Sequence, residues 1–260
     1  MFPNLVDIGF VHLKTYGACM AAGFLLCWHL VERLSGRKDM SNLLFSLMAA
    51  GIVGSRTAYV VEHWSSEFAA APLEVFSVWR GGLMFYGGFI LSMVVFFSWC
   101  IARKERPLAL ADLLCTVIPL GHACGRTGCF FYGCCYGRIS DSPLAVSFPV
   151  RSPAWSQQLH DGLIDASATG SLPVLPTQLF EAAALLVLFA VLLFVYRRWR
   201  RGTAGMYLIG YAALRFGMEY LRGDPRAAVG PFSVSQAISL GMAAVGAAML
   251  FYGKSPRHNR

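Results

Sequence analysis

The sequence has few charged residues. Only 14% of its 260 residues are Asp, Glu, Lys or Arg, whereas a soluble domain carries about 25%. Hydrophobic residues make up 56% of the chain. Apolar runs of about 20 residues recur, and each is long enough to cross a membrane core about 30 Å thick. These features exclude an ordinary water-soluble protein and predict an integral membrane protein.

Several common sequence features are also missing. No cationic segment precedes a short apolar stretch and a small-residue cleavage site at the N-terminus, so we expect no cleaved signal peptide. Tandem repeats, low-complexity tracts and heptad runs are absent. The formal net charge is +8, which would suggest nucleic acid for a soluble protein. In a membrane protein the position of the charges is more informative, and we expect no nucleic-acid partner.

Seven apolar segments predict an all-α fold with seven transmembrane helices. They lie near residues 15–32, 41–62, 84–102, 110–133, 177–196, 204–222 and 233–252. Thirteen of the 22 basic residues follow the first, third, fifth and seventh segments, and six lie in the opposite connections. The positive-inside rule therefore places the N-terminus outside and the C-terminus in the cytoplasm.

The two longest connections fall on the predicted outer side, at about 63–83 and 134–176. The second is rich in Ser, Pro, Asp and Gln. We interpret it as a small extracytoplasmic cap inserted in a single polytopic domain that spans residues 1–260.

Arginines lie inside three apolar segments, at Arg56, Arg126 and Arg215. A charge at the middle of a membrane helix costs at least about 2.5–3.5 kcal/mol, so such residues indicate a functional site. We expect one helix face to carry Tyr211, Arg215, Glu219 and Arg222.

Three arginines on three segments exceed what the single carboxylate of Glu219 can neutralise, so we expect an anion to complete the site. Phosphate suits the guanidinium fork. The alternative is a structural Arg215–Glu219 ion pair, with Arg222 reaching the membrane surface.

Glycines surround Arg126 in the stretch 121–138, GHACGRTGCFFYGCCYGR. Gly121 and Gly125 form a small-xxx-small pattern that is typical of helix packing. Small residues beside Arg126 also let a substrate approach its guanidinium. A second run, WRGGLMFYGG at 79–88, predicts a bent helix entry or a loop that lines a cavity.

Cysteines cluster beside Arg126, at Cys129, Cys134 and Cys135. No C-x-x-C pair occurs, so zinc or iron–sulfur binding is only weakly indicated. The remaining interpretations are a structural role, including a disulfide on the oxidising outer side, and a reactive or redox thiol beside the arginine.

Four motifs in this order resemble the bacterial prolipoprotein diacylglyceryl transferase family over nearly the whole chain. The run 79–88 is similar to W-x-G-G-x-x-x-H-G-G, and 125–137 to G-R-x-G-N-F-x-N-G-E-x-x-G. Residues 176–181, PTQLFE, are similar to P-[ST]-Q-L-Y-E, and 211–222, YAALRFGMEYLR, match Y-x-x-x-R-x-x-x-E-x-x-R.

The resemblance implies transfer of a diacylglyceryl group from phosphatidylglycerol to a cysteine thiol of prolipoproteins, with loss of glycerol phosphate. It implies a multi-pass protein of the bacterial cytoplasmic (inner) membrane that needs no metal or cofactor. Its expected partners are phosphatidylglycerol, a prolipoprotein signal peptide or another thiol acceptor, and membrane lipids.

The same resemblance suggests roles for individual residues. The expected catalytic residues are Arg126, Arg215, Tyr86 and Glu219. The expected substrate-binding residues are Arg56, Tyr59, Gly87, Gly88, Gly128, Cys129, Cys134, Gly137, Gln178, Tyr211 and Arg222.

The chain departs from the family pattern on the acceptor side. Tyr86 replaces the family histidine, and a phenol with a pKa near 10 is a poor base at neutral pH. Cys129 replaces an asparagine, Cys134 a glutamate, and Leu175 a second histidine. The alternatives are therefore a membrane thiol–disulfide protein that uses the clustered cysteines, or a non-catalytic lipid-binding relative or small transporter.

Overall fold

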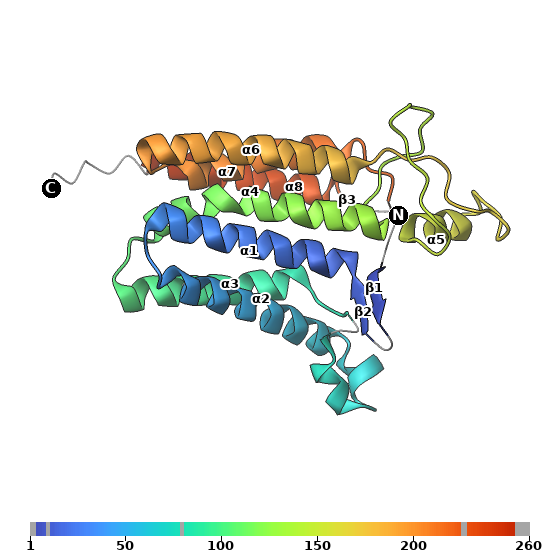
Figure 1. Cartoon of the computed structure of the whole chain (residues 1–260), viewed down its shortest axis with the longest axis horizontal. Coiled ribbons are helices and arrows are strands. Elements are labelled where there is room, and N and C mark those ends of the chain that lie inside the picture. The colour runs from blue at the N-terminus through green and yellow to red at the C-terminus, as the bar shows by residue number, and fades with distance from the viewer. Residues whose placement is uncertain (1–3, 9–10, 79–80, 225–227, 253–260) are drawn as a thin grey trace. The chain divides into compact units, whose positions relative to one another are not determined.

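Long helices dominate the computed structural model, which describes residues 4–8, 11–78, 81–224 and 228–252 (Figure 1). The long helices of the described chain are α1 (Thr15–Ser35), α2 (Met40–Glu62), α3 (Phe85–Arg103), α4 (Pro107–Tyr132), α6 (Thr177–Trp199), α7 (Thr203–Glu219) and α8 (Val234–Tyr252). Each coincides with one predicted apolar segment to within three residues at both ends.

Six of these helices are long and apolar enough to cross a membrane. The exception is α7, whose 17 residues extend about 26 Å at 1.5 Å per residue, less than the core thickness of about 30 Å. The architecture is that of a multi-pass helical membrane protein.

Short elements complete the described fold, and they amend the all-α prediction. Two antiparallel strand pairs are present. These strands are β1 (Asn4–Ile8), β2 (Val11–Lys14), β3 (Ala228–Val229) and β4 (Phe232–Ser233). The predicted long connections contain a π-helical turn η1 (Trp64–Phe68), a 3-10 helix η2 (Pro72–Phe76) and helix α5 (Pro153–His160). Strands of two to five residues are too short to give a clear alternating pattern.

The chain groups into two compact units, which are described separately: residues 31–110, and residues 1–30 with 111–260. In the unit 31–110, α2 packs closely on α3 through glycines. A Cβ at Gly54 would lie 2.8 Å from the Cβ of Leu91, and one at Gly88 would lie 2.6 Å from the carbonyl oxygen of Gly51. The glycines therefore permit a backbone approach that larger residues would block.

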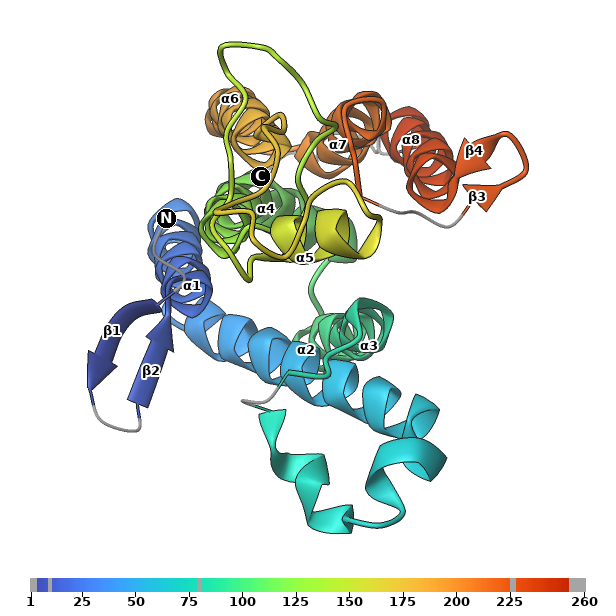
Figure 2. The same cartoon turned by 90° about the vertical axis from the view of Figure 1, so that its right-hand side faces the viewer.

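In the other unit, α4, α6, α7 and α8 run side by side (Figures 1 and 2). Small residues again set the closest contact, because a Cβ on Gly205 or on Gly246 would lie 2.8 Å from the other residue's carbonyl oxygen. This contact brings α7 and α8 together along their length.

A buried carboxylate connects the start of α7 to α4. Asp112 of α4 accepts hydrogen bonds from the backbone N–H of Gly202 (3.0 Å) and of Ala204 (2.8 Å). The Thr203 hydroxyl donates to the Asp112 carbonyl at 2.7 Å. Asp112 thus satisfies N–H groups that a helix N-terminus leaves without an intrahelical acceptor. These hydrogen bonds set the position of α7 along α4.

We expect Asp112→Ala to lower the free energy of unfolding by about 2–4 kcal/mol, because it leaves two buried N–H groups without an acceptor. Thermal unfolding in detergent micelles measures the change. Asp112→Asn keeps one carbonyl acceptor and should lose less. An alanine variant as stable as the original chain would contradict this role.

The connection 133–176 folds around its own small core. Phe148, Ala154 and Val174 are buried together with Tyr136, and α5 begins at Ser152, whose hydroxyl accepts from the Trp155 N–H at 3.2 Å. The connection therefore has a core of its own, and the predicted extracytoplasmic cap within a single domain stays a prediction.

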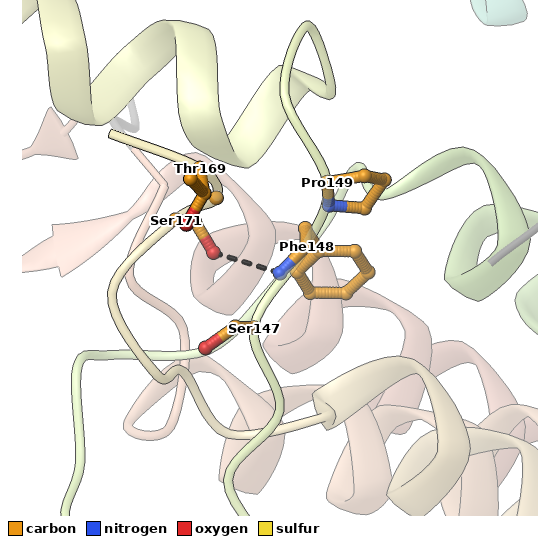
Figure 3. Close-up of a pocket in the computed structure, with 6 residues that line it drawn as sticks. Ser147, Phe148, Pro149, Thr169 and Ser171 are labelled. Carbon is orange, nitrogen blue, oxygen red and sulfur yellow. Dashed lines mark hydrogen bonds between the residues drawn. The ribbon is translucent and has the colours of Figure 1, made fainter. Parts of the chain in front are cut away.

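The insertion carries a shallow pocket of about 340 Å³ (Figure 3). Its lining residues are Ser147, Phe148, Pro149, Thr169, Gly170 and Ser171. The Phe148 N–H donates to the Ser171 hydroxyl at 2.9 Å across this pocket. No lining residue is ionisable, so the pocket offers no general acid, general base or charged side chain.

Candidate active site

Arg126, near the end of α4, forms an ion pair with Glu181, near the start of α6. The Arg126 Nε lies 3.0 Å from the Glu181 Oε1, and the Glu181 side chain is 1% exposed. Neither Glu181 oxygen accepts a hydrogen bond within the described chain, so the contact is a close but misaligned charge pair. Glu181 was not among the predicted site residues.

The sequence did contain a signal for Glu181. It is the only acidic residue in the apolar segment 177–196, and it ends the motif 176–181. The rule that selected the intramembrane arginines applies equally to this carboxylate.

Arg215 pairs with Glu219 one turn further along α7, as the i,i+4 spacing predicts. Their closest N–O distance is 3.0 Å. The Arg215 Nη2 also donates to the Ser235 hydroxyl at 3.0 Å. Ser235 lies in the first turn of α8, where Ser233 and Gln236 exchange hydrogen bonds as a capping box. The start of α8 therefore positions one edge of the Arg215 guanidinium.

Arg222 does not share the α7 face, because α7 ends at Glu219; that prediction is wrong. The chain turns after the helix, and Arg222 forms a β-bridge with Gly137. Its guanidinium binds Asp224 in a bidentate pair with two 2.7 Å contacts, and its side chain is 2% exposed. The turn still brings this arginine to the site, since the charges of Arg222 and Arg126 both act on Arg215.

The prediction that Arg56, Arg126 and Arg215 share the single carboxylate of Glu219 is also wrong. Arg56 donates to backbone carbonyl groups, whereas Arg126 pairs with Glu181 and Arg215 with Glu219. An anion is instead indicated by two buried donors. The Nη1 atoms of Arg215 and Arg222 are buried and have no hydrogen-bond partner within the described residues. Leaving such a donor unsatisfied costs about 1–3 kcal/mol, and more for charged groups. A ligand with several acceptor oxygens would satisfy both.

The three clustered cysteines come together at the end of α4. The Sγ atoms of Cys129, Cys134 and Cys135 all lie within 4.8 Å of one another, and all three are free thiols. The buried Gln178 side chain donates to the Cys134 carbonyl at 2.7 Å, and the Thr177 hydroxyl donates to the Cys135 carbonyl at 2.9 Å. The start of α6 thus holds the backbone that carries these thiols.

Cys135 is the most acidic thiol of the cluster. Hydrogen bonds from the thiols of Cys129 and Cys134, and the nearby charge of Arg222, lower the pKa of Cys135 below its ordinary value. Hydrogen-bond interactions with the thiols of Cys129 and Cys135 raise the pKa of Cys134. A single thiolate shared among three sulfurs accounts for both directions.

Tyr211 contacts rings rather than an arginine. Its ring centroid lies 5.3 Å from that of His122 and 5.8 Å from that of Tyr207, against which it stacks. Among the described residues, its hydroxyl makes no hydrogen bond to Arg126 or Arg215. Tyr211 therefore makes no direct contact with either arginine, and its predicted binding of substrate stays a prediction.

Two predicted substrate-binding glycines have packing roles. A Cβ at Gly128 would lie 3.1 Å from the Tyr16 ring, and one at Gly137 would lie 2.8 Å from the carbonyl oxygens of Leu175 and Leu221. Close packing is therefore enough to explain glycine at both positions, and their binding of substrate stays a prediction.

The remaining predicted site residues lie in the unit 31–110, where Arg56 organises the connection after α2. Its guanidinium donates to the carbonyl oxygens of Val75 (2.8 Å), Glu74 (2.6 Å), Gly81 (2.9 Å) and Gly82 (3.2 Å). An arginine has five N–H donors, so backbone groups use most of them. The predicted contact of Arg56 with a lipid headgroup gains no support from this arrangement.

Tyr59 extends the same network. Its hydroxyl donates to the Glu67 carboxylate at 3.0 Å, and its ring stacks on His63 at 4.1 Å. The Arg56 guanidinium lies 5.2 Å from the Phe68 ring centre, within the range of a cation–π contact.

We expect Arg56→Leu to loosen residues 64–78, because it removes the four hydrogen bonds that hold this connection. Amide hydrogen exchange there should accelerate at least about tenfold. Arg103→Leu removes an exposed arginine of the same unit and is the control. Equal exchange in the two variants would contradict the role assigned to Arg56.

Tyr86, Gly87 and Gly88 lie in the first turn of α3. Tyr86 is 55% exposed, whereas the two glycines face α2. The earlier part of this motif, Trp79 and Arg80, lies outside the described residues. The motif therefore begins a helix, as predicted, and its role with substrate stays a prediction.

Comparison with known proteins agrees with this set of motifs. The family model of prolipoprotein diacylglyceryl transferase matches residues 3–252. The chain is 30% identical to a phosphatidylglycerol–prolipoprotein diacylglyceryl transferase of Cupriavidus pinatubonensis, over 96% of this chain and 90% of that protein. It is 31% identical to the enzyme of that name from Vibrio cholerae, over 96% and 92%, and 30% identical to that of Vibrio atlanticus, over 99% and 94%. The chain belongs to the prolipoprotein diacylglyceryl transferase family.

Proposed function

We propose that this protein transfers the diacylglyceryl group of phosphatidylglycerol to a cysteine thiol of prolipoproteins and releases glycerol phosphate. One structural observation carries the proposal beyond family membership. The buried Nη1 atoms of Arg215 and Arg222 lack partners in the same charged cluster as Arg126. A phosphate diester offers the oxygens that these donors need.

In the proposed reaction, the acceptor sulfur attacks the glycerol carbon that is bonded to phosphate oxygen. The S–C bond forms, the C–O bond breaks, the thiol proton leaves to solvent, and the electron pair stays on the leaving phosphate. Arg126, Arg215 and Arg222 stabilise the charge that develops on this phosphate. Glu181 and Glu219 orient the first two guanidinium groups through their ion pairs. Holding the carbon and sulfur in line supplies much of the remaining rate.

Other predicted residues have assigned roles in this proposal. Gln178 supports the cysteine loop, and Tyr211 contacts the ring of His122, one helical turn before Arg126. The residues assigned to substrate binding or to the acceptor side are Arg56, Tyr59, Tyr86, Gly87, Gly88, Gly128, Cys129, Cys134 and Gly137.

The proposed setting is the bacterial cytoplasmic membrane. The chain crosses it seven times, with the N-terminus outside, and α7 is the short sixth span along the chain. The distribution of basic residues supports this orientation. A prolipoprotein signal peptide would then enter from the membrane and present its cysteine at the outer side.

The proposal is tested with purified protein in phosphatidylglycerol vesicles and a peptide that carries a lipoprotein cysteine. We expect a thioether-linked diacylglyceryl peptide and an equal amount of glycerol phosphate, both measured by mass spectrometry. A serine version of the peptide, and phosphatidylethanolamine vesicles, are the controls. Absence of both products from correctly folded protein would refute the proposal.

A further inference from the structure

The three clustered thiols have the spacing of a metal site. Zinc–thiolate bonds are about 2.3 Å long, so tetrahedral sulfurs lie ~3.8 Å apart. The Sγ atoms of Cys129, Cys134 and Cys135 already lie within 4.8 Å of one another. A contraction of about 1 Å or less, available through side-chain rotation, would therefore bring all three to bonding distance of one ion.

The backbone that carries these thiols is held in place from several directions. Gly133, with φ of 81°, reverses the chain after α4, and its N–H donates to the Cys129 carbonyl at 2.9 Å. Cys135 has a left-handed φ of 63°, an uncommon conformation for a residue other than glycine. Gln178 donates to the carbonyl group of Cys134, and Thr177 donates to that of Cys135. This strained and braced turn aims the three thiols at a common point.

The number of ligands indicates the kind of site. Within the described chain, no fourth His, Cys, Asp or Glu joins the three sulfurs. Structural zinc sites have four protein ligands, whereas catalytic zinc sites have three and keep one position open for water or substrate. We propose that Cys129, Cys134 and Cys135 bind one Zn²⁺ ion and leave its fourth position open for the acceptor thiol.

The surrounding charges favour this ion. Three thiolates and one Zn²⁺ have a net charge of −1. The positive charge of Arg222 acts on Cys135, and the charge of Arg126 acts on Cys129. Nearby cations therefore offset the excess negative charge in a partly buried setting. The sequence alone led us to expect no metal, because the ligands do not follow a C-x-x-C spacing.

The role of the open position rests on the proposed function. Transfer to sulfur requires a thiolate, and zinc deprotonates a thiol that coordinates it. The acceptor S–H would lose its proton to solvent as it binds. Its sulfur would then form the bond to the glycerol carbon, and the C–O electron pair would leave with the phosphate held by the arginines. No oxidant or reductant is involved.

Metal binding is tested without turnover. Purified protein in detergent, stripped of metal and then given Zn²⁺ alone, should bind one ion per chain in competition with a coloured chelator. Cys129→Ala, Cys134→Ala and Cys135→Ala should each weaken binding at least tenfold. Cys27→Ala and Cys115→Ala remove cysteines outside the cluster and should leave binding unchanged. Helix content by circular dichroism checks that each variant is folded.

X-ray absorption of the zinc-loaded original chain tests the geometry independently of any variant. We expect three sulfur neighbours at about 2.3 Å, rising to four when a cysteine peptide is added. No binding, equal binding by all variants, or a disulfide among the three thiols in freshly isolated membranes would overturn the site. If the number of sulfur neighbours of zinc stays at three when the cysteine peptide is added, the fourth position does not bind the acceptor thiol. Neither the zinc-binding measurement nor X-ray absorption requires product to form. Both can therefore be interpreted even if the transferase assay fails.

Discussion

Arg215→Ala should lower kcat/KM for diacylglyceryl transfer by at least about a hundredfold, because removing one preorganised donor to a developing oxyanion costs about 10²–10³ in rate. Arg215 is buried, and its free Nη1 is one of two donors available to the phosphate. Arg126→Ala should abolish detectable product. Thioether formation in phosphatidylglycerol vesicles measures both effects.

Two further variants complete this test: one separates the charge of Arg215 from its geometry, and the other is a control. Arg215→Lys keeps the positive charge but loses the planar fork, so its activity should lie between those of the original chain and Arg215→Ala. Arg198→Ala removes an exposed arginine at the end of α6 and should change kcat/KM less than twofold. Full activity in folded Arg215→Ala would remove this arginine from the proposed mechanism.

Glu181→Ala should have the largest effect on stability. It leaves the largely buried guanidinium of Arg126 without its carboxylate partner, and breaking a buried ion pair costs about 3–5 kcal/mol. Thermal unfolding in micelles should show a clear fall in Tm.

A double variant separates the contribution of the Arg126–Glu181 ion pair to stability from the role of Arg126 in activity. Glu181→Leu combined with Arg126→Met replaces the pair with apolar side chains and should recover much of the lost stability. It should remain inactive, because the phosphate ligand is gone. If Glu181→Ala unfolds at the same temperature as the original chain, the ion pair is not structural.

The helices could be predicted from the sequence because long apolar runs dominate a membrane protein. Their ends were harder to place. Arg222 follows Glu219 at a helical spacing, yet α7 stops at Glu219 and the chain turns to pair with Gly137. That pairing joins segments 85 positions apart, so no local pattern could reveal it.

The candidate site was predicted in part. The i,i+4 pair of Arg215 with Glu219 is local and therefore visible in the sequence. The partner of Arg126 comes from another helix, and counting charges without Glu181 gave the wrong balance. Arg56 also looked like a ligand-binding residue, but carbonyl groups of a distant connection take most of its donors.

The cysteine cluster likewise could not be recognised as a metal site from the spacing of its residues in the sequence. Four residues separate Cys129 from Cys134, and this matches no zinc motif. The sharp turn at Gly133 nevertheless brings the three sulfurs together. The contact depends on the end of α4 and on Gln178 of α6, neither of which a linear pattern describes.

Rescue of a bacterial strain depleted of its own prolipoprotein diacylglyceryl transferase shows whether this chain has the transferase activity in a living cell. We predict that this chain restores growth and thioether-modified lipoprotein, and that Arg215→Ala, inserted in the membrane at the same level, does not. The account would be contradicted if the inserted original chain yields no modified lipoprotein, or if Arg215→Ala restores it equally well.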